Sequence, residues 1–184
     1  MIRLFLVAFL AILSASAVHG QTSDGKEIVS RFMAAVIQDA GAGREASLSR
    51  VVDKYFAVDE FAEKALGADL GSISAELREA YLRSYRALLV RFIRKRIAES
   101  SRKELEILGV KKGAGQVDLV YSRVKDSSNR EHDVIWYVQR GRIIEIVYNG
   151  TLVTERQKSD FESIISRSSE GLKSLPSALD SLDP

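Results

Sequence analysis

EHDVIWYVQRGRIIEIVYN, residues 131–149, decides the fold. Val134, Trp136 and Val138 recur at every second position, and a similar alternation resumes after the Arg-Gly pair at 140–141. A period of two is typical of β-strands, because successive side chains of a strand point to opposite faces of its sheet. A connection of two residues forces the flanking strands to pair antiparallel. The stretch therefore predicts a β-hairpin.

Two further strands precede this hairpin. The period of two also runs through 104–110 and 116–125, and turn-forming residues separate these segments. We therefore expect a four-stranded antiparallel meander with strands at 104–110, 116–125, 131–139 and 142–149. One face should be apolar and the other mixed. The alternation assigns to the apolar face Val117, Leu119 and Tyr121 together with Val134, Trp136 and Val138.

Segments with helical spacing flank the meander on both sides. Apolar residues recur every three or four positions before it and after it, which predicts helices at 24–40, 48–56, 61–66, 74–100 and 154–168 and a short one around 172–179. Helices before and after an antiparallel meander indicate an α+β domain whose helices pack on one sheet face. A curved sheet covered in this way forms a cone, which either side chains or a ligand can fill.

The first twenty residues have the pattern of a secretory signal peptide. Arg3 precedes an apolar run at 4–13, and small residues follow at 14–17. This run is about half of the roughly 20 apolar residues that a membrane span needs. We expect residues 1–20 to be removed and residues 21–184 to form a single domain that is released into the periplasm. The sequence contains no cysteine, which excludes a lipid-modified cysteine, disulfides and cysteine nucleophiles.

The sequence offers little for catalysis. The mature chain has one histidine, His132, without a nucleophile motif or a set of metal ligands around it, so we expect no cofactor and no metal. Glu145, which the alternation places on a face with Ile143 and Val147, could serve as the base of a small periplasmic enzyme. An interaction module with a dry core is a further alternative.

Basic residues cluster between positions 86 and 112. The net charge of the whole chain is only +2, so its charge indicates no nucleic-acid partner. The cluster is either a solvated helix face or a surface that binds anionic headgroups or an acidic partner protein. We assign contact with a headgroup or partner to Arg91, Arg94, Lys95 and Arg96.

Several motifs together resemble one protein family. These are VDKYF at 52–56, FA at 61–62, ALG at 65–67, the helix YLRSYRALLVR at 81–91, DVIWY at 133–137, and Phe161 eleven residues after Gly150. In order and spacing they resemble the MlaC or toluene-tolerance family, over roughly residues 28–179. The resemblance implies a fold similar to NTF2-like cones, with phospholipid acyl chains enclosed between sheet and helices.

The resemblance also implies a role and partners. The chain would be a carrier rather than an enzyme, an auxiliary component of an ABC-type lipid transport system, and a monomer. It would shuttle phospholipid between an outer-membrane lipoprotein complex and an inner-membrane permease complex, and so support outer-membrane lipid asymmetry. Leu70 and Asn149 depart from the family's usual residues. A relative that carries another lipid, such as a hopanoid, is therefore an alternative.

The lining of the cavity is assigned from the aromatic and aliphatic residues of the long helix, the strands and the helix after them. Each of these residues could instead belong to an ordinary core. The expected lipid-binding residues are Tyr81, Tyr85, Leu89, Phe92, Leu119, Tyr121, Val134, Trp136, Ile146, Tyr148 and Phe161.

Overall fold

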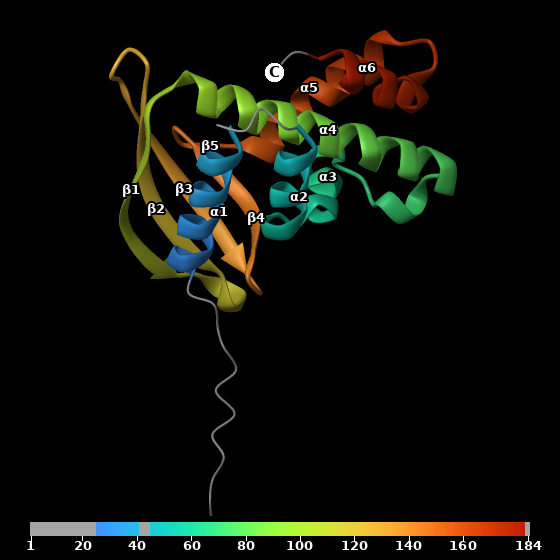
Figure 1. The fold of residues 1–184 in the computed structure, drawn as a ribbon. Coiled ribbons are helices and arrows are strands. Elements are labelled where there is room, and N and C mark those ends of the chain that lie inside the picture. Colours follow the sequence, from blue (N-terminus) through green and yellow to red (C-terminus); the bar gives the residue numbers. More distant parts are fainter. Residues whose placement is uncertain (1–24, 41–44, 183–184) are drawn as a thin grey trace, which may run out of the picture.

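The computed structural model describes residues 25–40 and 45–182. The expected signal peptide, residues 1–20, lies outside this part of the chain. The order of elements is helices, then an antiparallel sheet, then helices, which confirms the predicted α+β class. Figure 1 shows the helices gathered on one side of the curved sheet.

The sheet is a meander of five strands rather than four. Its strands follow the order of the chain, and each pairs antiparallel with the next. The added strand, β5, has two residues, which is too short for any period to show in the sequence. The strands are β1 (Ser100–Lys112), β2 (Asp118–Asp126), β3 (Glu131–Gln139), β4 (Arg142–Tyr148) and β5 (Thr151–Leu152).

Two tight turns build the last part of the sheet. Arg140 and Gly141 connect β3 to β4 with φ angles of 50° and 76°, and Asn149 and Gly150 connect β4 to β5 with φ angles of 48° and 81°. Positive φ at both central residues matches the twist of the strands that such a turn joins. The Arg-Gly turn predicted from the sequence is therefore present.

Six α-helices surround the concave side of the sheet in the described residues. They are α1 (Gly25–Ala40), α2 (Glu45–Tyr55), α3 (Val58–Leu66), α4 (Ala75–Glu99), α5 (Val153–Arg167) and α6 (Leu175–Ser181), with short 3₁₀ turns at Leu70–Ser72, Ala114–Gln116 and Gly171–Ser174. Helix α1 contacts β1, β2, β3 and β4, so it lies along the concave face (Figure 1). Helix α4 continues into β1 without a loop.

A backbone contact fixes the start of α1 on the sheet. The N–H of Gly25 donates to Asp118 Oδ2 at 3.0 Å, and Lys112 Nζ donates to Asp118 Oδ1 at 2.6 Å. A Cβ atom on Gly25 would lie 2.6 Å from Asp118 Cβ, so only glycine allows this approach. Burial raises the pKa of Asp118, but the two hydrogen bonds outweigh burial and hold the pKa below its usual range.

The register of β2 corrects the predicted apolar face. Val120 pairs with Trp136 and is fully buried, whereas Leu119 pairs with Tyr137 and Tyr121 pairs with Ile135. Leu119 and Tyr121 are half-buried and lie on the opposite face from Trp136, contrary to the sequence-based assignment.

Polar residues explain this error. Asp118 and Ser122 lie on the concave face although they are polar, because hydrogen bonds satisfy them there. Ser122 Oγ accepts from the indole N–H of Trp136 at 2.8 Å and donates to the carbonyl oxygen of Val134 at 3.1 Å. Alternation alone could not indicate that the face with more polar residues is the inner one.

Candidate functional site

A cavity of about 480 Å³ opens between the sheet and the helices. Small-molecule sites commonly have volumes of roughly 300–1,000 Å³. Its walls come from α1, the C-terminal half of α4, the hairpin of β2 and β3, and β4. Residues that line it are Phe32, Met33, Phe56, Phe92, Ile93, Arg96, Ile97, Glu99, Val124, Lys125, Asp126, Ser127, Arg130, His132, Val134, Trp136, Ile146, Tyr148 and Val153.

The floor of the cavity is aromatic. Phe32 of α1 lies 5.2 Å from Phe56 and 5.7 Å from Trp136 between ring centroids, both in edge-to-face geometry. A hydrogen bond of 2.9 Å from the N–H of Ala57 to the carbonyl oxygen of Ile143 holds the Phe56 backbone against β4. Because the Trp136 indole N–H is bonded to Ser122, this end of the cavity presents apolar surface to a ligand.

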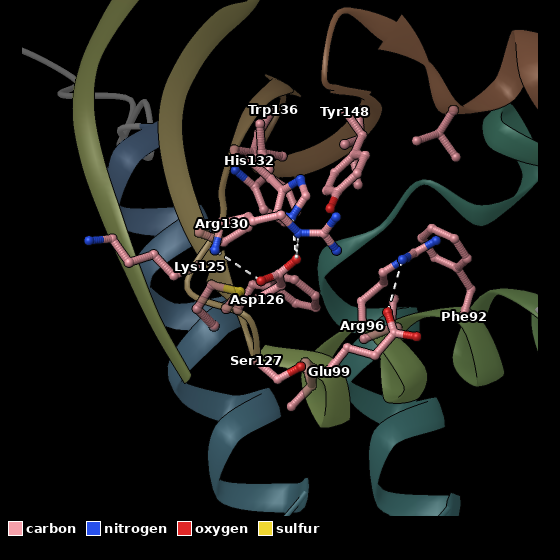
Figure 2. Close-up of a pocket in the computed structure, with 18 of the residues that line it drawn as sticks. Phe92, Arg96, Glu99, Lys125, Asp126, Ser127, Arg130, His132, Trp136 and Tyr148 are labelled. Carbon is pink, nitrogen blue, oxygen red and sulfur yellow. Dashed lines mark hydrogen bonds and ion pairs between the residues drawn. The ribbon is translucent and has the colours of Figure 1, made fainter. Parts of the chain in front are cut away.

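The other end of the cavity is charged (Figure 2). Asp126, at the end of β2, accepts from the backbone N–H groups of Ser128 and Arg130 at 2.8 and 3.0 Å. Its Oδ2 also accepts from Arg130 Nε at 2.9 Å and lies 3.1 Å from His132 Nε2. The hydrogen bond with His132, followed by those from Arg130 and Ser128, holds the pKa of Asp126 far below its usual range.

His132 connects this carboxylate to the β4–β5 turn. Its Nδ1 lies 3.0 Å from Asn149 Nδ2, while Asn149 Oδ1 accepts from the N–H of Asp133 at 3.2 Å. An amide nitrogen can only donate, so Nδ1 accepts and the ring hydrogen lies on Nε2, which donates to Asp126. The ring also stacks on Tyr148 with centroids 5.4 Å apart.

Arg96 forms the opposite rim. Its guanidinium lies 5.0 Å from the ring centroid of Phe92 and 5.6 Å from that of Tyr148. Arg96 Nη1 also donates to Glu99 Oε2 at 2.9 Å. The backbone N–H of Ser127 donates to the carbonyl oxygen of Glu99 at 2.8 Å, which joins the end of α4 to the β2–β3 turn. We use "the mouth" for the charged residues Arg96, Glu99, Lys125, Asp126 and Arg130 together with His132.

Comparison with protein families matches residues 26–181 to a family model described as "MlaC protein". The chain belongs to the MlaC family. Its fold is similar to that of a phospholipid-binding protein from Ralstonia solanacearum solved in complex with a phospholipid. The TM-score is 0.67 at 17% sequence identity, over 86% of this chain and 96% of that one. None of the curated proteins compared with this chain matches it.

Five of the predicted lipid-binding residues line the cavity of this MlaC-family chain. They are Phe92, Val134, Trp136, Ile146 and Tyr148. They come from α4, β3 and β4, and their side chains cover both the floor and the rim. Their contact with a lipid stays a prediction.

Four others lie in a packed region away from the cavity. Tyr81 and Tyr85 of α4 contact Phe161 of α5 in edge-to-face geometry, with centroids 6.4 and 6.2 Å apart, and Leu89 is also buried. The Tyr81 hydroxyl donates to the carbonyl oxygen of Ala62, and that of Tyr85 donates to Gln157 Oε1, each at 2.7 Å. Burial raises the pKa of both phenols, so they stay protonated. None of these four lines the cavity.

The predicted basic residues separate in space. Arg96 lies at the mouth, whereas Arg91 is half-buried and donates to the carbonyl oxygen of Leu179 in α6 at 2.6 Å. Arg91 therefore supports the packing of α6 on α4, because its guanidinium is bonded there. Arg94 and Lys95 are exposed on α4 and do not line the cavity.

Glu145, the candidate base, lies outside the cavity. A register shift at Ile144 sends Ile143 to the face of Val138 and pairs Glu145 with Tyr137, so Glu145 and Ile143 do not share a face as expected. The Glu145 carboxylate is buried and accepts from the hydroxyl of Thr154 at 2.5 Å and from the N–H of Ile146 at 2.9 Å. Its contacts tie β4 to α5.

Several residues of the site were missed from the sequence. Phe32 lies in α1 and Phe56 directly follows α2, and only the fold brings them into one cluster with Trp136. His132 could have been found, because it shares the period-two face of Val134 and Trp136. In the described part of the chain, no group of three or more His, Cys, Asp or Glu residues could hold a metal ion, and no helix there is long and apolar enough to cross a membrane.

Proposed function

We propose that this protein is a phospholipid carrier that encloses acyl chains in the cavity between α1, α4 and the sheet. The observation that carries this proposal is the division of the cavity into an aromatic floor and a charged mouth. A phospholipid has the same division into apolar chains and a charged headgroup. The family, and the similar protein solved with a phospholipid, support the assignment.

The physics of lipid transfer favours such a cavity. Burying a methylene group gains about 0.8 kcal/mol relative to water, so acyl chains are held firmly against escape into solvent. Relative to a bilayer this gain almost vanishes, because the chains are already in hydrocarbon. A carrier that matches the bilayer can therefore accept and release its cargo without an enzyme-like set of specific contacts.

In this proposal the protein shuttles lipid in the periplasm. Residues 1–20 direct export and are removed, and the mature domain moves as a monomer between an outer-membrane lipoprotein complex and an inner-membrane ABC permease complex. This transport supports outer-membrane lipid asymmetry. Family membership is the main support. The exposed Arg94 and Lys95 on α4 are the residues that we assign to partner docking.

Lipid analysis of the purified protein tests the carrier function. We expect native mass spectrometry of the mature protein to show about one phospholipid per chain, which denaturation then releases for identification. A released hopanoid would mean that the protein carries this lipid instead of a phospholipid. A bare polypeptide would contradict lipid carriage.

A matched pair of variants tests the position of the cargo. Ile146 lines the cavity, and its neighbour Val147 pairs with Ile135 on the other face of the sheet. We expect Ile146→Trp to fill the cavity and lower the amount of retained phospholipid several-fold, whereas Val147→Trp should retain it. Equal retention by the two variants would place the lipid elsewhere.

A further inference from the structure

The positive side chains of the mouth all form ion pairs. Arg96 Nη1 is 2.9 Å from Glu99 Oε2, and Arg130 Nε is 2.9 Å from Asp126 Oδ2. Lys125 Nζ is 3.3 Å from Glu131 Oε1, just outside the lining. Each cation at the opening therefore has a carboxylate beside it. The mouth presents both signs of charge instead of a positive patch.

Arg130 and Glu99 each have polar atoms that can bind a ligand in addition to their present partners. In its described contacts Arg130 binds Asp126 through its Nε and backbone N–H, and its terminal nitrogens point across the mouth toward Tyr148 (Figure 2). This planar pair of donors has the geometry that binds phosphate. Glu99 is about half-exposed and accepts from Arg96 through Oε2. Asp126, by contrast, already accepts hydrogen bonds from Ser128, Arg130 and His132.

We propose that the mouth selects zwitterionic headgroups, which carry a phosphate and an ammonium, over headgroups with a net negative charge. This inference rests on the proposed function, since it concerns the lipid in the same cavity. The phosphate binds the terminal nitrogens of Arg130, and the ammonium binds Glu99. A headgroup with an uncharged end, such as glycerol, makes the phosphate contact but gains nothing from Glu99.

The exposure of Glu99 sets how strongly the mouth can prefer a zwitterionic lipid over an anionic one. A contact between partly exposed charges changes an equilibrium by a factor of up to about five. The phosphate contact with Arg130 is common to both lipid classes, so it raises binding without separating them. Glu99 therefore determines the ratio of bound zwitterionic lipid to bound anionic lipid, and Arg130 determines how much lipid of both classes is bound.

Competition between two lipids with identical chains tests this assignment. Lipid-free protein is incubated with vesicles of equimolar dioleoyl-phosphatidylethanolamine and dioleoyl-phosphatidylglycerol, and native mass spectrometry counts each lipid bound. We expect about threefold more of the ethanolamine lipid on the unchanged protein. Glu99→Gln should bring the ratio close to one by lowering the amount of the ethanolamine lipid that is bound. Arg130→Gln should lower the total and keep the ratio.

The control is Asp160→Asn, which removes an exposed carboxylate of α5 and should leave both values unchanged. Salt gives a second measurement that needs no variant, because raising the ionic strength should bring the wild-type ratio toward one. Equal uptake of the two lipids at low salt, or an excess of phosphatidylglycerol, overturns the selection while lipid carriage stands. Uptake of neither lipid overturns carriage as well.

Discussion

Helix α4 divides between two environments, and its two halves differ in what they face. The N-terminal half places Tyr81 and Tyr85 against Phe161, with both hydroxyls bonded to protein atoms. The C-terminal half places Phe92 and Arg96 at the edge of the cavity. One continuous helix therefore contributes to both a close-packed core and the wall of a cavity.

The neighbours of each half explain the difference. Helices α3 and α6 pack on α4, and α5 places Phe161 against its N-terminal half. The C-terminal half faces the curved sheet and α1, and a cavity remains between them. The comparison shows that an apolar stripe predicts burial, whereas the elements opposite the stripe decide between a core and a cavity.

Truncation of one aromatic residue on each side gives the largest expected effect. Phe161→Ala should lower the free energy of unfolding of the lipid-free protein by about 3–5 kcal/mol, because the ring is fully buried and its loss leaves a void. Phe92→Ala should cost only about 1 kcal/mol, since one side of that ring already faces the cavity. Urea denaturation monitored by circular dichroism measures both values.

Lipid retention should show the reverse order. Phe92→Ala should release phospholipid more readily, whereas Phe161→Ala should retain it in the molecules that stay folded. Equal losses of stability in the two variants would mean that both halves of α4 are packed alike, and the comparison would fail.

Acid titration tests the contribution of Asp126, at the mouth of the cavity, to stability. The expected effect is smaller than that of Phe161→Ala. The pKa of Asp126 is lowered in the folded protein, so its stabilisation is present above the unfolded-state pKa of about 3.9 and is lost as the pH falls toward the lower folded value. We expect the free energy of unfolding of the wild type to fall below about pH 4. Asp126→Asn should start less stable at pH 7 and show a shallower fall.

The matched control is Asp160→Asn on α5, which should follow the wild-type curve. Urea denaturation at several pH values between 7 and 2.5 supplies the data. A slope of Asp126→Asn equal to that of the wild type would show that the carboxylate network does not stabilise the mouth.

The smallest effect on stability is expected on the face of the sheet opposite Trp136, which is directed away from both halves of α4. Tyr121 is half-buried there, and Lys111 Nζ lies 5.2 Å from its ring centroid. Tyr121→Ala should cost about 1 kcal/mol, mainly the cation–π contact and partial burial. Retained phospholipid, measured by native mass spectrometry, should be unchanged. Loss of lipid from this variant would return Tyr121 to the binding residues.

The fold was largely predictable from the sequence because it depends on local periodicity. Trp136 and its neighbours at every second position indicated the hairpin, and the Arg140-Gly141 pair indicated its turn. Strand β5 and the start of β1 at Ser100 were missed, since two residues show no period and α4 enters β1 without a turn.

The site was only partly predictable, because its polar residues depend on contacts between distant segments. Ser122 is buried because the Trp136 indole binds it, and this bond crosses two strands. The mouth forms where Glu99 at the end of α4 meets Ser127 in the β2–β3 turn. No spacing in the sequence relates Ser122 to Trp136 or Glu99 to Ser127. Without the Ser122–Trp136 bond, the alternation in β2 assigns Leu119 and Tyr121 to the wrong face.

The bond between Trp136 and Ser122 has a practical consequence. Trp136 is the single tryptophan of the chain, it forms part of the cavity wall, and its indole nitrogen is fixed at 2.8 Å from the serine hydroxyl. Its fluorescence emission thus arises from one chromophore of known orientation. If the cavity holds the lipid as proposed, we expect loading and unloading to change this intrinsic signal, so that both can be followed without a dye or a label.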